Sequence, residues 1–227
     1  MTYAPLELIA GRLIASVQAP AGSPVRDTEV IAALAGAALL GGASGLRLNS
    51  PDDIRRMRSS TSAPIIGLHK VWNGVRNIIT PDVALAAGLA EAGADIIAVD
   101  ATIEQLGESF ALLGEIGEAT ARPVMADVST FDEGMRAWEA GAAVVGTTLS
   151  GYTPHSAHQE GPDLQLVAEL AAAGVPTIAE GRYQSPDQVR AAFDAGALAV
   201  VVGGAITDPI AITRRFVAVT PAVRSPA

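Results

Sequence analysis

Six polar side chains stand at the ends of short apolar runs, where an enzyme could use them for proton transfer. They are Gln18, Arg47, Lys70, Asp100, Asp127 and Glu180. A neutral amine or a carboxylate can act as a general base, and the protonated forms can act as general acids. A single charged residue at the end of a strand is more often a cap or a solvated rim residue. Six polar residues at the ends of six such runs favour one common site.

These residues share one face of their expected strands with small or apolar side chains. Successive residues of a strand point to opposite faces, so a residue faces the same way as the second residue before it. The pairs are Lys70 with Leu68, Asp100 with Ala98, Asp127 with Met125, Glu180 with Ile178 and Arg47 with Gly45. Asp100 is also placed to cap the turn that follows it, so a structural role stays open for this residue. His69 has the opposite parity to Lys70 and is expected to pack between the sheet and a helix.

Eight short apolar runs predict the strands that position these residues. They span residues 12–18, 45–49, 64–70, 94–100, 123–128, 142–148, 176–181 and 198–204. Helical patterns alternate with them through short links, which predicts a single-domain α/β fold, the closed (β/α)8 TIM barrel. A doubly wound open sheet is the alternative, but no GxGxxG motif follows the first run. Barrel enzymes carry their active sites at the carboxyl ends of the strands, where the six polar residues fall.

The expected helices begin and end with two repeated devices. An N-cap hydroxyl, a proline and an acid occur together at Ser50-Pro51-Asp52, Thr80-Pro81-Asp82 and Ser185-Pro186-Asp187. This order is typical of the first turn of a helix. Gly93, Gly141 and Gly196 each follow a helical run and precede an apolar one. They are therefore predicted to be the glycines that end these helices.

Glycines after the last two runs predict an anion site. Gly181-Arg182 and Gly203-Gly204 let a ligand approach the main chain closely, and barrels often bind phosphate here on backbone N–H groups. The alternative is that these glycines only make tight turns. The segment 147–163 exceeds the usual βα loop, which predicts a lid or binding loop. His155 and His158 within it are expected to be solvated.

The composition narrows the range of partners. A net charge of −9 repels phosphate backbones, so we expect no nucleic-acid partner. Zero cysteines and three histidines favour neither a metal nor a redox cofactor. No apolar run predicts a membrane span or a signal peptide, so we expect a cytoplasmic protein. The barrel is expected over residues 1–219, followed by a disordered tail at 220–227.

Six strings of the sequence resemble those of the bacterial N-acetylmannosamine-6-phosphate 2-epimerases. They are SVQA (16–19), ADVST (126–130), GTTLSGYTP (146–154), EGPDL (160–164), IAEGR (178–182) and VGGAIT (202–207). The resemblance runs from about residue 13 to residue 216 and is far more specific than any short motif. It implies a (β/α)8 barrel, usually a homodimer, that interconverts ManNAc-6-phosphate and GlcNAc-6-phosphate in sialic acid catabolism without a cofactor.

The resemblance also implies a role for each matching residue. Lys70 and Glu180 would be the catalytic pair. The sugar and its N-acetyl group would contact Gln18, Arg47, Asp127 and Thr148, and the phosphate would contact Gly181, Arg182, Gly203 and Gly204. The partners would be a small sugar phosphate and a second copy of the chain, with no metal.

The mechanism that this assignment predicts requires a lysine with a lowered pKa. Lys70 would move the proton at C2, and Glu180 would move the protons at C1 and O5. Free lysine titrates near 10.4, so its pKa must fall by roughly three units to be useful near neutral pH. Burial and the Arg47 cation would lower the pKa of Lys70, whereas Glu180 and Asp127 would raise it.

Three positions depart from the family pattern. Asp208 stands where an arginine is common, which would remove one phosphate contact, and segments 69–74 and 101–106 also differ. Two alternatives therefore stay open. One is a related barrel enzyme that acts on a different or unphosphorylated amino sugar, and the other is a non-catalytic sugar-phosphate-binding protein. A pentulose-phosphate epimerase would need a set of metal-binding histidines and acids that this chain lacks.

Overall fold

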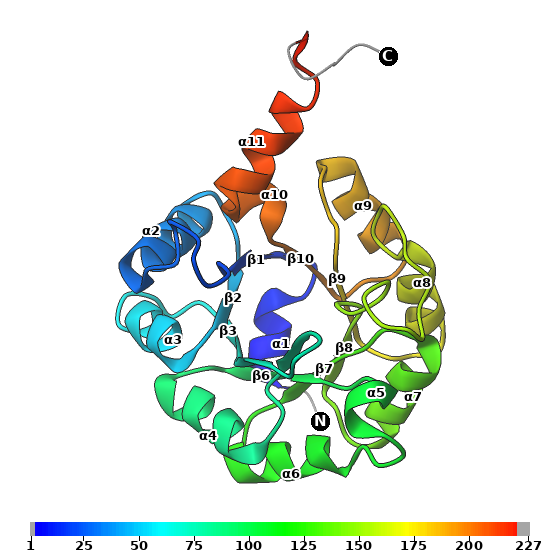
Figure 1. The fold of residues 1–227 in the computed structure, drawn as a ribbon. Helices are drawn as coiled ribbons and strands as arrows, with labels where there is room; N and C mark the ends of the chain where they lie inside the picture. The colour runs from blue at the N-terminus through cyan, green and yellow to red at the C-terminus, as the bar shows by residue number, and fades with distance from the viewer. Residues whose placement is uncertain (1–2, 222–227) are drawn as a thin grey trace.

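Strands and helices alternate along the chain and close into a ring (Figure 1). The computed structural model describes residues 3–221. The barrel strands are β1 (Leu13–Val17), β2 (Gly45–Asn49), β3 (Ile65–Leu68), β6 (Ile96–Asp100), β7 (Val124–Asp127), β8 (Val144–Gly146), β9 (Thr177–Glu180) and β10 (Ala199–Val202). All neighbours pair in parallel, in the order β1-β10-β9-β8-β7-β6-β3-β2. The predicted TIM barrel is confirmed.

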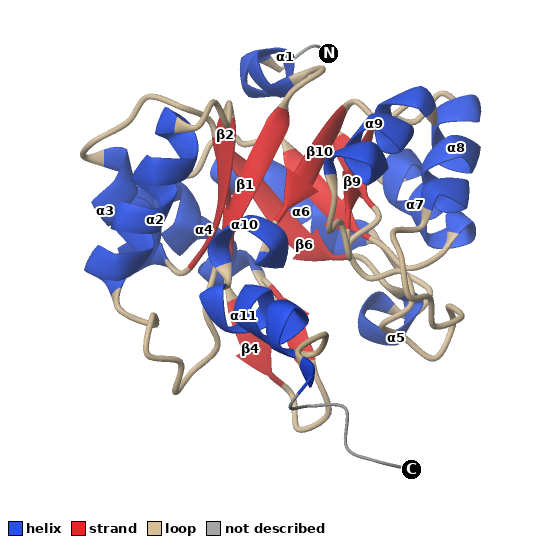
Figure 2. Cartoon of the chain, turned by 90° about the horizontal axis from the view of Figure 1, so that it is seen from above, coloured by secondary structure: helices blue, strands red, loops and turns tan. Residues whose placement is uncertain are grey.

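The helices surround this barrel and close one of its ends. They are α1 (Ala4–Ile9), α2 (Thr28–Leu40), α3 (Pro51–Arg58), α4 (Val83–Ala92), α5 (Ile103–Leu106), α6 (Ala111–Thr120), α7 (Phe131–Glu139), α8 (Leu164–Ala172), α9 (Pro186–Asp194), α10 (Gly204–Thr207) and α11 (Pro209–Val217). Helix α1 lies at one end of the barrel, and α11 lies toward the other end (Figure 2). Between residues 3 and 221, no helix has the length and hydropathy needed to cross a bilayer.

Two apolar layers hold the barrel together. The inner layer includes Ile14, Ile66, Met125 and Ile178, and Ile9 of α1 joins it from the closed end. The outer layer packs the other strand face against the helices, mainly through Ala, Val, Ile and Leu. Because side chains alternate across a strand, each strand serves both layers. The inner layer ends at the carboxyl ends of the strands, where polar side chains replace it.

Most of the predicted helix ends are confirmed. The Ser50 hydroxyl accepts the Asp53 amide at the start of α3, and Ser185 forms a capping box at the start of α9. Gly93, Gly141 and Gly196 all have positive φ, as residues that end helices commonly do. The prediction for Thr80 is wrong.

The true N-cap of α4 is Asp82, whose carboxylate accepts the Leu85 amide. The hydroxyl of Thr80 instead accepts the His69 amide at 3.0 Å, and the Thr80 amide donates to the His69 carbonyl at 2.8 Å. A tertiary contact thus takes the hydroxyl that the local pattern assigned to the helix.

The third predicted strand ends earlier than expected. Barrel strand β3 stops at Leu68, and Lys70 begins a separate antiparallel hairpin of β4 (Lys70–Trp72) and β5 (Asn77–Ile79). An Asn73-Gly74 turn explains the hairpin, since this dipeptide is a strong turn signal and Gly74 has a φ of 97°. The hairpin extends beyond the carboxyl ends of the barrel strands (Figure 2).

The last helix does not cover the barrel. Figure 1 shows α11 pointing away from the ring of helices. It exposes Phe216 and Val217 at its end, and Val219 just after it is also exposed. Residues 222–227 of the predicted tail lie outside the described part of the chain.

Candidate active site

Four predicted site residues meet in the barrel mouth around one guanidinium. Arg47 comes from β2, Asp127 and Glu180 end β7 and β9, and Thr148 follows β8. Arg47 Nη2 lies 2.5 Å from Asp127 Oδ2, and Arg47 Nη1 donates to Glu180 Oε2. The Thr148 hydroxyl donates to Asp127 and lies 3.2 Å from Glu180 Oε2. Strands distant in sequence thus build one connected polar cluster.

This cluster holds more carboxylates than cations in a place shielded from water. The side chains of Arg47, Asp127 and Glu180 are only 1%, 0% and 13% exposed. Burial opposes the charge of Arg47, but the two carboxylates outweigh it and raise the pKa of the guanidinium. Burial also raises the pKa of Asp127 to about 7, with the Arg47 cation opposing and the Glu180 charge adding to the rise. A carboxyl group with such a pKa can exchange a proton near neutral pH.

Lys70 faces this cluster from across the barrel. The hairpin that carries it follows β3, and β3 and the strand β9 of Glu180 lie four places apart around the ring in both directions, so they are opposite one another. The residue is exposed on the hairpin, but its ammonium group lies close enough to the cluster to feel the charges of Arg47, Asp127 and Glu180. Burial and the nearby Arg47 cation lower the pKa of Lys70, and Glu180 and Asp127 oppose this change. These are the four causes that the sequence predicted.

The mouth also holds polar atoms that lack a partner. Gln18 follows β1 and donates its Nε2 to Ser16 Oγ at 2.9 Å. Within the described residues, the buried Gln18 Oε1 and Arg47 Nε make no hydrogen bond. A buried polar atom without a partner costs free energy, so such atoms mark places where a ligand can bind. Here one acceptor and one donor are left available.

A cavity of about 200 Å³ opens beside the cluster toward β9 and β10. Its lining includes Glu180, Gly181, Arg182, Gly203 and Gly204, together with Thr148, Tyr152, Tyr183, Gln184 and Val201. The structure therefore brings all four residues of the predicted phosphate site together. Gly181 has a φ of 110°, which only glycine adopts easily and which keeps the turn free of a Cβ.

The Arg182 guanidinium is engaged with the long loop. Its Nε donates to the Gly161 carbonyl at 2.7 Å, and its Nη1 donates to the Ser150 carbonyl at 2.5 Å. It also lies 5.0 Å from the centre of the Tyr152 ring. Arg182 thus ties the 147–163 loop to the β9 turn, and it also lines the cavity. Its own backbone has a positive φ of 59°, which is uncommon outside glycine.

The remaining polar candidates have different surroundings. Asp100 is fully buried and accepts hydrogen bonds from the Thr102 amide, the Thr102 hydroxyl and Arg76, so it acts as a structural anchor. His69 is half-buried, and its Nδ1 is buried without a hydrogen-bond partner in the part of the chain that the structure describes. His155 and His158 are exposed, as expected. Residues 3–221 contain no cluster of three or more potential metal ligands.

Sequence reasoning missed the residues that hold the hairpin in place. Arg76 donates to Asp100 at 2.5 Å, to Thr102 at 3.0 Å and to Glu104 at 3.1 Å. At the base of the hairpin, the Lys70 amide donates to Asn49 Oδ1 at 2.9 Å. The Asn73-Gly74 dipeptide was the available signal for a hairpin, but it does not predict which partners the hairpin binds.

A (β/α)8 barrel with an amine and a carboxyl group of raised pKa at its mouth is the arrangement of an acid–base enzyme such as an isomerase. Comparison with known proteins gives the same class. Residues 31–222 match the family model described as "Putative N-acetylmannosamine-6-phosphate epimerase". The chain belongs to this family of epimerases, which are isomerases.

Individual relatives cover nearly the whole chain. A protein of Caldanaerobacter subterraneus subsp. tengcongensis, named "Putative N-acetylmannosamine-6-phosphate 2-epimerase", is 44% identical over 211 residues, which are 90% of this chain and 89% of the relative. A protein of Yersinia pseudotuberculosis serotype O:3 with the same name is 48% identical over 198 residues, covering 86% and 84%.

Solved structures agree with the fold. The N-acetylmannosamine-6-phosphate 2-epimerase of Clostridium perfringens matches with a TM-score of 0.90 and 36% identity, over 97% of this chain and 98% of that chain. The thiamine phosphate pyrophosphorylase of Pyrococcus furiosus has a TM-score of 0.58 and 16% identity over 92% of each chain, so it shares only the fold.

Proposed function

We propose that this epimerase interconverts N-acetylmannosamine-6-phosphate and N-acetylglucosamine-6-phosphate. The relatives at 44% and 48% identity carry the name of this activity. The observation that carries the proposal is the pairing of Lys70 and Glu180 on opposite walls of one mouth, beside the glycine-lined cavity. An amine on one side and a carboxyl group on the other match a reaction that moves a proton at a carbon next to a carbonyl.

The chemistry begins with opening of the sugar ring. Glu180 takes the proton of the C1 hydroxyl and a proton passes to O5, which breaks the C1–O5 bond and leaves an aldehyde at C1. The C2 hydrogen is then acidic because it lies next to a carbonyl group. Glu180 stands at the end of β9, 13% exposed, and is bound by Arg47 and Thr148. This arrangement fixes the direction in which its carboxyl group can act.

Lys70 then moves the proton at C2. Its neutral amine takes the proton and becomes an ammonium ion, while the electron pair moves to O1 as an enolate. The Arg47 cation and the proton that Asp127 can carry near neutral pH stabilise the charge on O1. The enolate then turns about its C2–C3 bond and presents the other face of C2 to Lys70, whose ammonium ion returns the proton and gives the epimer. Closure of the ring reverses the first step.

Substrate contacts follow from the partners that the mouth leaves free. Gln18 Oε1 can accept from the N-acetyl amide or a hydroxyl, and Arg47 Nε can donate to a sugar oxygen. The phosphate would lie in the cavity on the backbone N–H groups of Gly181, Arg182, Gly203 and Gly204. No cofactor enters this scheme, because every proton and electron pair is supplied by the sugar and the side chains.

Exchange with heavy water tests the proposal. The purified protein is incubated with ManNAc-6-phosphate in D2O and followed by proton NMR. We expect GlcNAc-6-phosphate to form with deuterium at C2, and we expect Lys70→Ala to abolish the C2 exchange while it still binds the sugar phosphate. A wild-type protein that binds the sugar phosphate without exchanging C2 would instead be a binding protein.

A second candidate substrate is the unphosphorylated sugar, ManNAc. Asp208 follows the Gly203-Gly204 turn, and its carboxylate accepts the Ala211 amide at 3.0 Å as the N-cap of α11. It places a negative charge near the phosphate end of the cavity, which disfavours an anion. The ratio of kcat/KM for the two sugars decides between them. A ratio above about a hundred for the phosphorylated sugar would exclude ManNAc, since that difference corresponds to about 2.7 kcal/mol.

We also infer that the protein forms a homodimer. An apolar groove of about 380 Å³ runs beside β1 and β10, lined by Leu13, Pro186, Val189, Val202, Ala205 and Ile206, with Gln184 and Ser185 at its edge. Helix α11 lies beside this groove, points away from the barrel and exposes Phe216. An apolar groove next to an exposed apolar helix end supports pairing of two copies. Light scattering should give twice the chain mass, and Phe216→Asp should lower it toward a monomer.

A further inference from the structure

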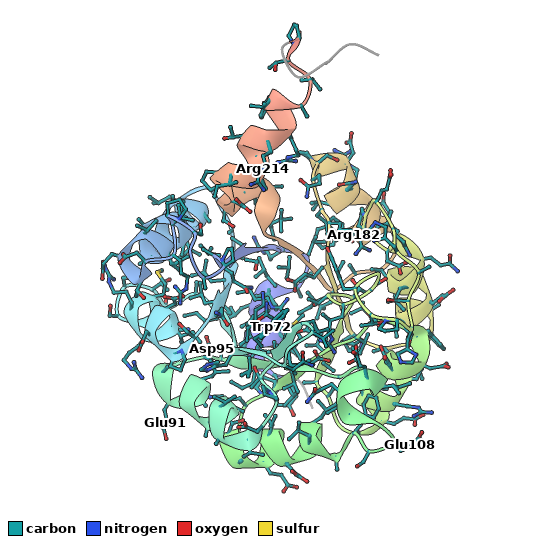
Figure 3. The ribbon with its side chains drawn as sticks, in the orientation of Figure 1. Trp72, Glu91, Asp95, Glu108, Arg182 and Arg214 are labelled. Atoms are coloured by element: carbon teal, nitrogen blue, oxygen red, sulfur yellow. The ribbon has the colours of Figure 1, made fainter. Side chains whose placement is uncertain are left out.

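The hairpin β4–β5 turns one of its faces toward the barrel axis. Lys70 pairs with Ile79, and Trp72 pairs with Asn77, so these four residues share a face. Ile79 is buried in the apolar cluster inside the barrel. The face that carries Lys70 and Trp72 is therefore the face toward the mouth. In the view along the barrel, Trp72 lies near the middle of the ring of helices (Figure 3).

The hairpin is held at both ends, so Trp72 has a defined place above the mouth. At its base, Thr80 binds both polar backbone atoms of His69, and Asn49 binds the Lys70 amide. Near its tip, Arg76 binds the buried Asp100 at 2.5 Å. Within the turn, Asn73 Oδ1 accepts the Val75 and Arg76 amides, each at 2.9 Å. These contacts hold the hairpin, and with it Lys70 and Trp72, in one position relative to the barrel.

Trp72 nevertheless leaves most of its side chain uncovered. It is 63% exposed, although tryptophan is usually largely buried. An indole ring offers a large, rigid apolar surface at a low cost in conformational entropy. The opposite wall of the mouth, with Glu180 and the glycine turns, is polar. A ligand between the two walls would meet an aromatic surface on one side and anion-binding backbone on the other.

We propose that Trp72 is a specificity-determining residue that packs against the C2 N-acyl group and the adjoining face of the sugar ring. The inference rests on the proposed function, because the reaction requires C2 to face Lys70. The N-acyl group is attached to that same carbon, so it lies on the hairpin side of the ligand. Trp72 comes two residues after Lys70 on the same strand face, which places it against this substituent.

The contact would act on binding more than on the proton transfers. The N-acyl group does not change its charge during the reaction, so Trp72 would stabilise the bound sugar and the transition state equally. Loss of such uniform binding raises KM and leaves kcat nearly unchanged. A sugar with a free amine at C2 would gain less from an apolar partner, so Trp72 would favour the acylated sugar.

Steady-state kinetics of three variants test the proposal. We expect Trp72→Ala to raise KM for ManNAc-6-phosphate about tenfold with kcat changed less than about twofold. Trp72→Phe keeps an aromatic ring and should fall between this variant and the wild type. Trp138→Ala is the matched control, since Trp138 is 38% exposed on the outer helix α7. An unchanged KM in Trp72→Ala, or an equal rise in Trp138→Ala, would overturn the inference.

Fluorescence gives a second readout, which measures binding and does not depend on turnover. The chain has two tryptophans, so Trp138→Phe leaves Trp72 as the single indole reporter and Trp72→Phe leaves Trp138. Saturating GlcNAc-6-phosphate should shift the emission of Trp138→Phe to shorter wavelength and leave that of Trp72→Phe unchanged. If the wild type turns over the sugar and Trp72 stays silent, the inference fails alone. If the wild type turns over neither sugar, the proposed function fails and the inference with it.

Discussion

Replacement of Asp127 by asparagine should change how stability depends on pH. In the folded protein, burial and the Glu180 charge outweigh Arg47 and raise the pKa of Asp127 from 3.8 to about 7. An unfolded aspartate titrates near 3.9. Between these values the folded state binds more protons than the unfolded state, so the free energy of unfolding falls as pH rises. The favourable contribution is complete below about pH 4 and is lost as pH rises through about 7.

The size of the effect follows from the same pKa values. A rise of about three pKa units at about 1.4 kcal/mol each gives about 4 kcal/mol once the group is fully ionised. This figure is an upper limit, because the side chains around Arg47 can rearrange. Asp127→Asn leaves one guanidinium, Arg47, against one carboxylate, Glu180, and removes the excess negative charge. We therefore expect the variant to gain about 2 to 4 kcal/mol relative to the wild type between pH 5 and pH 8.

Urea unfolding at several pH values measures this difference. The quantity to compare is the free energy of unfolding of Asp127→Asn minus that of the wild type, which cancels the titration of all other groups. Glu180→Gln is a second variant, because it removes one of the causes that raise the pKa of Asp127. It should also make the curve flatter. Parallel curves for the wild type and Asp127→Asn would refute the reasoning that the folded protein disfavours the ionised form of Asp127.

Three further changes have defined outcomes. Arg76→Lys removes the guanidinium that binds Asp100 and Glu104 and so loosens the hairpin that carries Lys70. We expect kcat/KM to fall about tenfold and the lowered pKa of Lys70, read from the pH–rate profile, to move back toward 10.5. The control Arg55→Lys, at an exposed position, should leave both quantities unchanged. Gly67→Ala would place a Cβ 2.7 Å from Ala94 and 2.8 Å from Ile54, so the free energy of unfolding in urea should fall by about 1 to 3 kcal/mol. The control Gly36→Ala in helix α2, whose Cβ would meet nothing within 4 Å, should be neutral or stabilising. Arg182→Ala removes two hydrogen bonds to the long loop, so amide hydrogen exchange of residues 147–163 should become faster. Unchanged exchange would show that Arg182 does not hold the loop.

The hairpin shows where local patterns stop being informative. A continuous apolar run at 64–70 predicted one strand, but β3 ends at Leu68. The parity argument still placed Lys70 toward the mouth, because the hairpin pairs it with the inward-facing Ile79. The side-chain partners of Arg76 are 24 to 28 residues away in sequence, so no local signal contains them. Asp100 is the corresponding case, since an Asx-type cap was predictable and the buried ion pair was not.

The sequence by itself determined the order of elements, the closed barrel and the residues at the strand ends, because apolar spacing, proline-led N-caps and helix-ending glycines act over a few residues. It also identified the family, since six strings along the chain resemble it. Only the tertiary structure decided that Arg47 binds both Asp127 and Glu180, that the Arg182 guanidinium holds a loop and that α11 points away from the barrel. These features depend on which strands become neighbours when the barrel closes, and on burial that raises or lowers a pKa only after distant side chains meet.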